Sequence, residues 1–198
     1  MKPEQVMKAI KKEFQITPEN ADMFRVAFNK GKAIVLEYNG DYKDGNIEFY
    51  SLERTADNSL ERIKVGGMHF GNAMYQTAWL TTIWVYQSDK TSNQQDYRGF
   101  GIAAYGLKFF EEVLYSKGQR SIDGDYMDNG GTAWDLYKKN GYVVFDGTVG
   151  KGVDEDVISE IKNNTTLMDG VKLYLPLAEW KLNPPKPKVE TPYGGWFN

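Results

Sequence analysis

The sequence contains no cysteine and a single histidine, His69, among its 198 residues. Without cysteine there can be no disulfide, no thiol catalysis and no cysteine-ligated metal. A zinc site would have to be assembled largely from carboxylates, and their spacing suggests nothing of the kind. We therefore expect no metal site. The chemistry of any site must come from carboxylates, hydroxyls, backbone groups or a bound cofactor.

Long apolar runs and an excess of positive charge are also missing. No apolar run approaches the roughly 18–20 residues that a membrane span needs, and residues 1–15 are typical of an amphipathic helix, not of a signal peptide. The chain carries 24 Lys and Arg against 27 Asp and Glu, a net charge of −3. This balance disfavours nucleic-acid binding. We expect a cytoplasmic protein that binds neither membrane nor nucleic acid.

The hydrophobic pattern predicts one domain built on a mixed sheet. Helices are predicted at residues 3–15 and 18–30, followed by strands at 33–38, 47–52, 63–70 and 79–86. The remaining predicted elements are a helix at 102–116, a strand at 120–126, a helix at 132–139, a strand at 142–145, a helix at 154–162 and a strand at 171–177. This order predicts an α/β fold, a mixed sheet with helices on its faces.

The last residues differ from the rest in composition. Four of the 7 prolines lie between positions 184 and 192, and proline-rich sequence prefers an extended conformation that cannot form a core. We predict a single domain over residues 1–181 and a proline-rich tail over 182–198. The tail either packs on its own domain through its aromatic residues or is held by a partner.

A glycine-rich turn, Arg98-Gly99-Phe100-Gly101-Ile102-Ala103, stands where a strand-like run gives way to a helix-like run. Such a turn presents several backbone N–H groups in one direction, with the positive end of the helix dipole behind them. Arg98 adds a fork of donors that suits phosphate oxygens. Two interpretations stay open: an anion site, or a tight turn that needs glycine only for its backbone geometry.

A second motif lies about thirty residues further on, at Ala133–Tyr142 (AWDLYKKNGY). The glycine turn matches the signature Q/R-x-x-G-x-G/A, and the second segment is similar to A-x-x-L-Y-x-x-x-G-F/Y. Together these motifs resemble the GNAT superfamily of acyl-CoA-dependent N-acyltransferases. The resemblance covers residues 30–146. It implies a GNAT-like fold, a central and mostly antiparallel sheet with a V-shaped splay, flanked by helices.

The resemblance also implies binding residues for acetyl-CoA. Backbone groups of Gly99, Phe100, Gly101, Ile102 and Ala103 would hold the pyrophosphate, assisted by Arg98. Trp84, Val85 and Tyr86 occupy the strand that would pair with the pantetheine arm, and a backbone N–H near Val85 would stabilise the oxyanion. Asn129 is a further candidate contact, since Gly130 stands where the family commonly has asparagine.

Tyr137 matches the family tyrosine that lies near the thiolate leaving group and acts as a general acid. The alternative is an ordinary core tyrosine on a short amphipathic helix. Many family members carry a glutamate as general base in the strand that pairs with the pantetheine arm, and residues 77–86, which include this strand here, contain no carboxylate or histidine. Substitute bases are Glu48, His69, Asp123 and Asp125. A lone strand histidine is more often structural, and the two aspartates are expected to be solvated or to stabilise a turn.

Two functions follow from these features. The first is an N-acetyltransferase that moves an acetyl group from acetyl-CoA to an amine, either a small molecule or a protein lysine or N-terminus. The alternative is a GNAT-fold binding or assembly module with weak or silent catalysis, for example a virion-associated part of a phage particle. The missing base and the polar insertion at residues 88–95 favour the alternative. The tail favours it too, because it resembles an arm for a homo-oligomer or a larger assembly.

Overall fold

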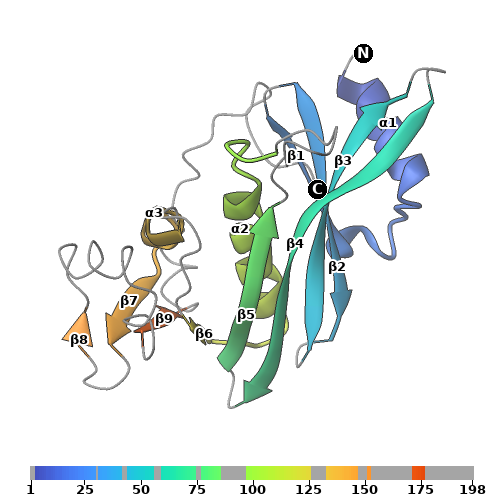
Figure 1. Ribbon diagram of the computed structural model, residues 1–198. Helices are drawn as coiled ribbons and strands as arrows, with labels where there is room; N and C mark the ends of the chain where they lie inside the picture. Colours follow the sequence, from blue (N-terminus) through green and yellow to red (C-terminus); the bar gives the residue numbers. More distant parts are fainter. Residues whose placement is uncertain are drawn as a thin grey trace.

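The computed structural model describes residues 3–29, 31–41, 44–55, 59–74, 77–85, 97–125, 133–146, 151–152 and 171–176. Within them, nine strands form one sheet in the order β1-β2-β3-β4-β5-β6-β9-β7-β8 (Figure 1). The strands are β1 (Phe24–Asn29), β2 (Lys32–Gly40), β3 (Gly45–Arg54), β4 (Leu60–Met74), β5 (Thr77–Val85), β6 (Ser121–Asp125), β7 (Val143–Asp146), β8 (Lys151–Gly152) and β9 (Val171–Pro176).

The helices are α1 (Pro3–Glu13), α2 (Ile102–Ser116) and α3 (Ala133–Lys139), with one turn of 3-10 helix at Ala21–Met23. Neighbouring strands are antiparallel, with β5 and β6 as the parallel pair. The predicted α/β class, a mostly antiparallel mixed sheet flanked by helices, is confirmed. No helix among the described residues is long and apolar enough to cross a bilayer.

The helix predicted at residues 18–30 is wrong. Its place is taken by the 3-10 turn and by β1, whose residues Phe24, Val26 and Phe28 alternate toward the face that α1 covers. Gly31, with φ +78°, makes the tight turn that lets β1 pair with β2 from Phe24 to Asn29. Alternating burial of large apolar side chains stabilises a strand here more than the local helical pattern stabilises a helix.

The sheet buries a different apolar cluster on each face. α1 covers β1, β2 and β3 with Ile10 and, just beyond its end, Phe14. α2, which has the predicted bounds, packs on the opposite face against Phe49, Phe70 and other core residues. At the contact, a Cβ on Gly106 would lie 2.4 Å from Cζ of Phe49. The glycine therefore allows α2 to lie close against the sheet.

β5 is longer than the described part of β6 and pairs with it over its first residues. They pair from Thr77 with Ser121 to Leu80 with Gly124, whereas β5 continues along β4 as far as Val85, which pairs with Gly66. Within the described residues, the second half of β5 is thus paired with β4 alone. The described part of β6 ends at Asp125, one residue beyond its pairing with β5, so the V-shaped splay that the family resemblance implies stays a prediction.

Substitution of Gly106 tests the close packing of α2. Gly106→Val is expected to lower the free energy of unfolding by about 2 kcal/mol, because the added side chain must displace the Phe49 ring or lift the helix. Chemical denaturation followed by circular dichroism measures the change. Ala104→Val, at a half-buried position of the same helix, is the matched control and should cost less than about 1 kcal/mol. Equal losses in the two variants would contradict the close contact.

Candidate functional site

The glycine turn takes the conformation that opens the N-terminus of α2. Gly99 has φ +75° and Gly101 has φ +71°, both in the left-handed region that favours glycine. Gly101 is the N-cap, and the N–H of Tyr105 donates to its carbonyl at 3.0 Å. The N–H groups of residues 102–104 precede this first helical bond and have no acceptor within the helix. They form a cluster of donors at the helix end.

The electrostatics of the turn favour an anion. α2 has 15 residues and no acidic residue in its first turn, so its positive dipole end faces no carboxylate of its own. The side chain of Arg98 is exposed beside this end. The combination of helix end and guanidinium suits a phosphate group better than a cation.

Trp84 and Phe100, the aromatic residues predicted to contact the cofactor, pack against other parts of the protein. A Cβ on Gly67 would lie 2.8 Å from Cζ2 of Trp84, so the indole extends across β4, on the side of β5 away from β6. Phe100 is half-buried against the core, with its ring centroid 6.4 Å from that of Tyr97. The indole of Trp84 therefore does not cover the edge of β5 that faces β6.

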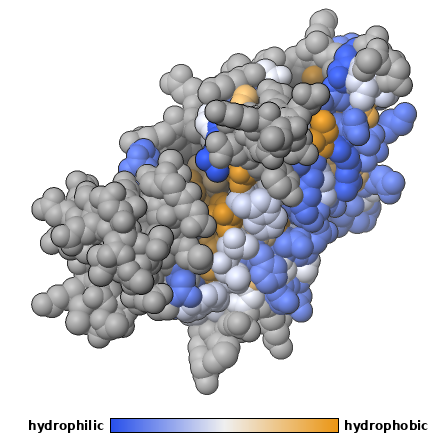
Figure 2. All heavy atoms as spheres, in the orientation of Figure 1, coloured by the Kyte–Doolittle hydropathy of each residue, from blue (hydrophilic) through white to orange (hydrophobic). Residues whose placement is uncertain are grey.

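The carboxyl end of β5 and the N-terminus of α2 lie at the same end of the molecule. Figure 1 shows the N-terminus of α2 beside the end of β5 that carries Val85. Figure 2 shows apolar surface over α2 along the side of β5 that faces β6. Ile83 and Val85 are partly buried and pack against the core. The arrangement offers N–H donors at one end of an apolar strand edge.

Tyr137 is buried, with 5% of its surface exposed, and belongs to the core cluster. Its ring packs edge-on against Tyr142, with centroids 5.5 Å apart. Burial and the charge of Glu111 raise the pKa of Tyr142 well above its usual value. This environment fits the core interpretation of Tyr137, and its role as an acid stays a prediction. Asn129, Tyr86, the helix at 154–162, the insertion at 88–95 and the tail at 182–198 lie outside the described residues.

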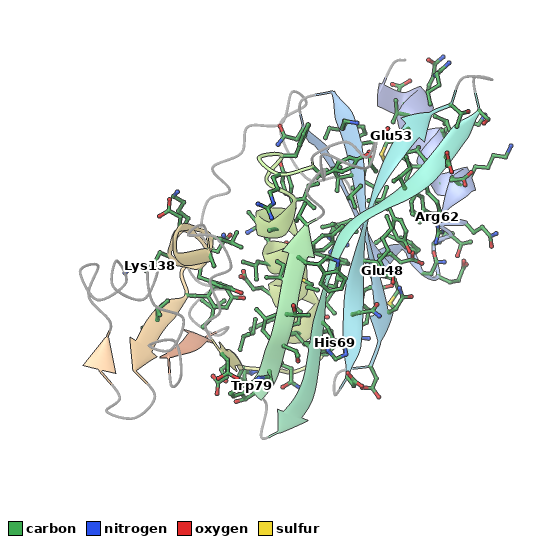
Figure 3. All side chains as sticks on the ribbon, viewed as in Figure 1. Glu48, Glu53, Arg62, His69, Trp79 and Lys138 are labelled. Atoms are coloured by element: carbon green, nitrogen blue, oxygen red, sulfur yellow. The ribbon has the colours of Figure 1, made fainter. Side chains whose placement is uncertain are left out.

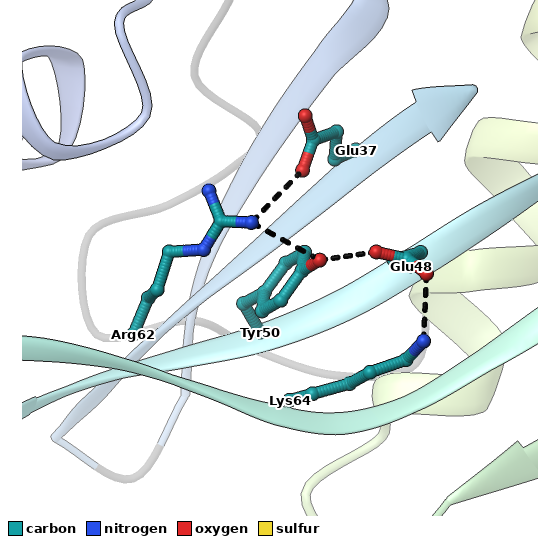
Figure 4. A network of polar contacts seen from close by, with 5 residues as sticks. All are labelled: Glu37, Glu48, Tyr50, Arg62 and Lys64. Carbon is teal, nitrogen blue, oxygen red and sulfur yellow. Dashed lines mark hydrogen bonds and ion pairs between the residues drawn. The ribbon is translucent and has the colours of Figure 1, made fainter.

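Glu48 is held in a polar network on the face of the sheet opposite α2 (Figures 3 and 4). Lys64 Nζ donates to Glu48 at 2.6 Å, and the hydroxyl of Tyr50 donates to the same carboxylate. Partial burial acts to raise the pKa of Glu48, but these bonds and the nearby cations hold it below its usual value. A low pKa makes Glu48 a weak general base at neutral pH.

Arg62 closes this network. Its guanidinium lies over the ring of Tyr50, 4.6 Å from the centroid, and 4.0 Å from a carboxylate oxygen of Glu37. It also donates to the Tyr50 hydroxyl at 3.3 Å. Burial and the neighbouring Glu48 raise the pKa of Tyr50 to about 12. The members of the network satisfy one another, which indicates a structural role.

The other candidate bases differ in their surroundings. His69 Nε2 lies 3.2 Å from Asp44 Oδ1, and the histidine is half-exposed. Asp125 is exposed. Asp123 lies within β6 and not in a turn; it is half-buried, its Oδ1 has no hydrogen bond among the described atoms, and burial raises its pKa. The structure does not gather these four candidates into one site.

Residues that sequence reasoning missed hold the glycine turn in place. Asn29, at the end of β1, donates from Nδ2 to the carbonyl oxygen of Phe100 at 2.5 Å. The hydroxyl of Tyr97 donates to Glu53 on β3, which also forms an ion pair of 2.5 Å with Lys32. These contacts join positions 71 and 44 residues apart in the chain, and no local sequence signal indicates them.

Comparison with known proteins gives likeness at the level of structure. No protein-family model matches the sequence, and neither does any curated protein. Among solved structures, the chain is similar to PaiA N-acetyltransferase from Thermoplasma acidophilum in complex with coenzyme A (TM-score 0.40, 14% identity, 66% of this chain and 59% of that one). The chain thus spans less than two thirds of that enzyme.

Two further structures show similar values. They are an IAA acetyltransferase from Bacillus cereus (TM-score 0.42, 15% identity, 68% and 78% of the chains) and the ribosomal-protein-S18-alanine N-acetyltransferase from Escherichia coli (TM-score 0.41, 14% identity, 70% and 72%). All three of these structures are acetyltransferases by name. The likeness concerns the arrangement of strands and helices, and the substrates of those enzymes do not transfer to this chain.

Asp123 provides a test of the electrostatics at the β5–β6 junction. Because its pKa is raised on folding, its protonated form contributes stability below the unfolded pKa of about 3.9, and this contribution is lost as the pH rises through the folded pKa. Asp123→Asn is therefore expected to raise the Tm at pH 7, with a gain that fades as the pH falls toward about 3.9.

Thermal unfolding at several pH values measures this gain. Asp125→Asn, at an exposed position of the same strand, is the control and should change the Tm little at any pH. A Tm gain for Asp123→Asn that is the same at every pH would show that the carboxylate charge is not its cause.

Proposed function

We propose that this protein binds acetyl-CoA at the glycine turn and transfers the acetyl group to an amine. The observation that carries the proposal is the glycine-capped N-terminus of α2 beside the end of β5 that carries Val85. The family resemblance of the Arg98–Ala103 and Ala133–Tyr142 motifs supports it. The acceptor class is a small-molecule amine or the lysine or N-terminal amine of a protein.

The turn suits a pyrophosphate because its donors are backbone groups with fixed positions. The N–H groups that follow Gly101 lie on the positive end of α2, and the exposed Arg98 supplies a fork of further donors. Hydrogen bonds to charged oxygens are roughly twice as strong as neutral ones. Binding of the nucleotide end would thus be supported chiefly by the backbone.

The edge of β5 suits an extended chain that carries amides. The backbone of residues 82–85 pairs with β4 on one side, and on the other it can pair with the amides of a pantetheine arm, as an added strand does. The apolar surface beside it excludes water from the arm (Figure 2). A backbone N–H near Val85 then lies close to where the thioester carbonyl would sit and can stabilise negative charge on its oxygen.

Acetyl-CoA supplies an activated acyl carbon, to which the amine nitrogen bonds as the carbon–sulfur bond breaks. In the proposal Tyr137 gives its phenolic proton to the departing sulfur and regains one when the products leave. The proton released by the amine passes to water, since β5 carries no carboxylate or histidine and Glu48 is engaged by Lys64. Correct placement of the two reactants supplies the main rate gain.

A binding module without turnover is the second candidate. The observation that favours it is the 5% exposure of Tyr137, which packs as a core residue against Tyr142. In that case coenzyme A would bind at the turn without acetyl transfer. The two predictions below separate binding from catalysis.

Coenzyme A at millimolar concentration is expected to raise the Tm of the wild-type protein by mass action. Gly101→Glu should abolish the rise, because its carboxylate meets the anion at the N-terminus of α2. Gly118→Glu is the matched control. Gly118 also has a positive φ, +87°, lies at the other end of the helix, and has no atom within 4 Å of an added Cβ. Absence of a Tm rise in the wild type would refute the proposed function.

Tyr137→Phe separates catalysis from binding. If Tyr137 is the general acid, the variant should lose about 10²-fold or more in turnover and keep its affinity for coenzyme A. Release of free thiol from acetyl-CoA with a panel of amines measures turnover, and calorimetry measures binding. Tyr115→Phe, a tyrosine of α2, is the control. Equal turnover in wild type and Tyr137→Phe would remove Tyr137 from the mechanism.

A further inference from the structure

The peptide between Phe100 and Gly101 is held by a residue outside the turn. Asn29 is 5% exposed, and its Nδ2 donates to the Phe100 carbonyl at 2.5 Å. The described peptide bonds are trans, and in a trans peptide the C=O and the following N–H point in opposite directions. The N–H of Gly101 therefore points away from Asn29 and from β1.

The orientation of this peptide decides which group it presents at the helix end. Its rotation would change ψ of Phe100 and φ of Gly101, and glycine at position 101 permits both hands of backbone conformation at little cost. Rotation would exchange the N–H for a carbonyl oxygen at the helix end, which repels an anion. A hydrogen bond that fixes the carbonyl inward thus fixes a donor outward.

A second contact fixes the chain just before the turn. Tyr97 is 5% exposed, and its hydroxyl donates to Glu53, which also accepts from Lys32 Nζ at 2.5 Å. The Lys32 ammonium lies 5.2 Å from the centroid of the Tyr97 ring. The residue that enters the turn is thereby tied to β2 and β3.

The far half of α2 is attached to the same strand as Asn29. Arg25 of β1 forms an ion pair of 3.2 Å with Glu112 and lies over the Phe109 ring, 5.1 Å from its centroid. β1 therefore holds α2 at two places: Arg25 near the end of the helix and Asn29 at its start. The Arg25 contact can only dock the helix, whereas the Asn29 contact also orients a peptide of the turn.

We infer that Asn29 is a positioning residue for anion binding, which acts by holding the Phe100–Gly101 peptide with its N–H outward, and that Tyr97 with Glu53 fixes the entry to the same turn. The inference rests on the proposed function for the identity of the anion, the pyrophosphate of coenzyme A. The orientation of the peptide does not depend on that identity.

The test compares Asn29→Ala, Asn29→Asp and Arg25→Ala in the full chain. Calorimetry measures the dissociation constant of coenzyme A, and thermal unfolding without ligand measures stability. Asn29→Ala should weaken binding by about threefold to tenfold, the worth of one neutral hydrogen bond. Asn29→Asp should weaken it more, because a carboxylate accepts the Gly101 N–H and favours the rotated peptide. Arg25→Ala should lower the Tm and leave the dissociation constant unchanged.

Three results would overturn the inference or isolate it. If Asn29→Ala lowers the Tm like Arg25→Ala but keeps wild-type affinity, Asn29 only docks the helix and the inference is wrong. Should Asn29→Ala fail to fold, wild-type affinity in the near-isosteric Asn29→Asp overturns it equally. If the wild type does not bind coenzyme A, the proposed function fails, and amide hydrogen exchange over residues 98–105 decides the inference. Faster exchange in Asn29→Ala than in Arg25→Ala supports it, and equal exchange refutes it.

Discussion

β5 and β6 run parallel from Thr77 to Leu80, and two parallel neighbours cannot be joined by a hairpin. The chain must leave the carboxyl end of β5 and return to the starting end of β6, and α2 makes this return. Its N-terminus is thereby placed at the carboxyl end of β5, where ligands bind in open α/β sheets. The glycine turn and the carboxyl end of β5 are thus neighbours because β5 pairs in parallel with β6.

The two faces of the sheet differ in what they hold: one packs against α2, and the other carries a network of paired charges. On the side of α2, Gly106 allows the helix to approach Phe49, so the helix end and its turn are fixed relative to β5. On the other side, Arg62, Lys64, Glu37, Glu48 and Tyr50 bind one another (Figure 4). These charges are matched locally, on the face of the sheet away from the turn. An anion site in a chain of net charge −3 depends on such local pairing.

Local pattern predicted much of the fold. α2 was predictable because an apolar stripe from Ile102 is bounded by glycine at both ends, and most strands because apolar runs stand between turn residues. β1 was not, since Phe24, Val26 and Phe28 adopt a strand through pairing with β2 and cover by α1. The turn itself was readable from its glycines. Asn29 and Glu53 were not, because only the folded sheet brings them to Phe100 and Tyr97.

Asn29 and Glu53, which sequence reasoning missed, and the general base, which it did not find, both depend on contacts between distant strands. Backbone donors are held in position by residues of distant strands. Local sequence therefore does not indicate which residues support a binding site of this kind. Deprotonation of an amine needs a group of suitable pKa at the reacting atoms. The hydrogen bonds that lower the pKa of Glu48 make it a poor acceptor of protons. The proposed reaction therefore relies on an amine that is already neutral and on the placement of the two reactants.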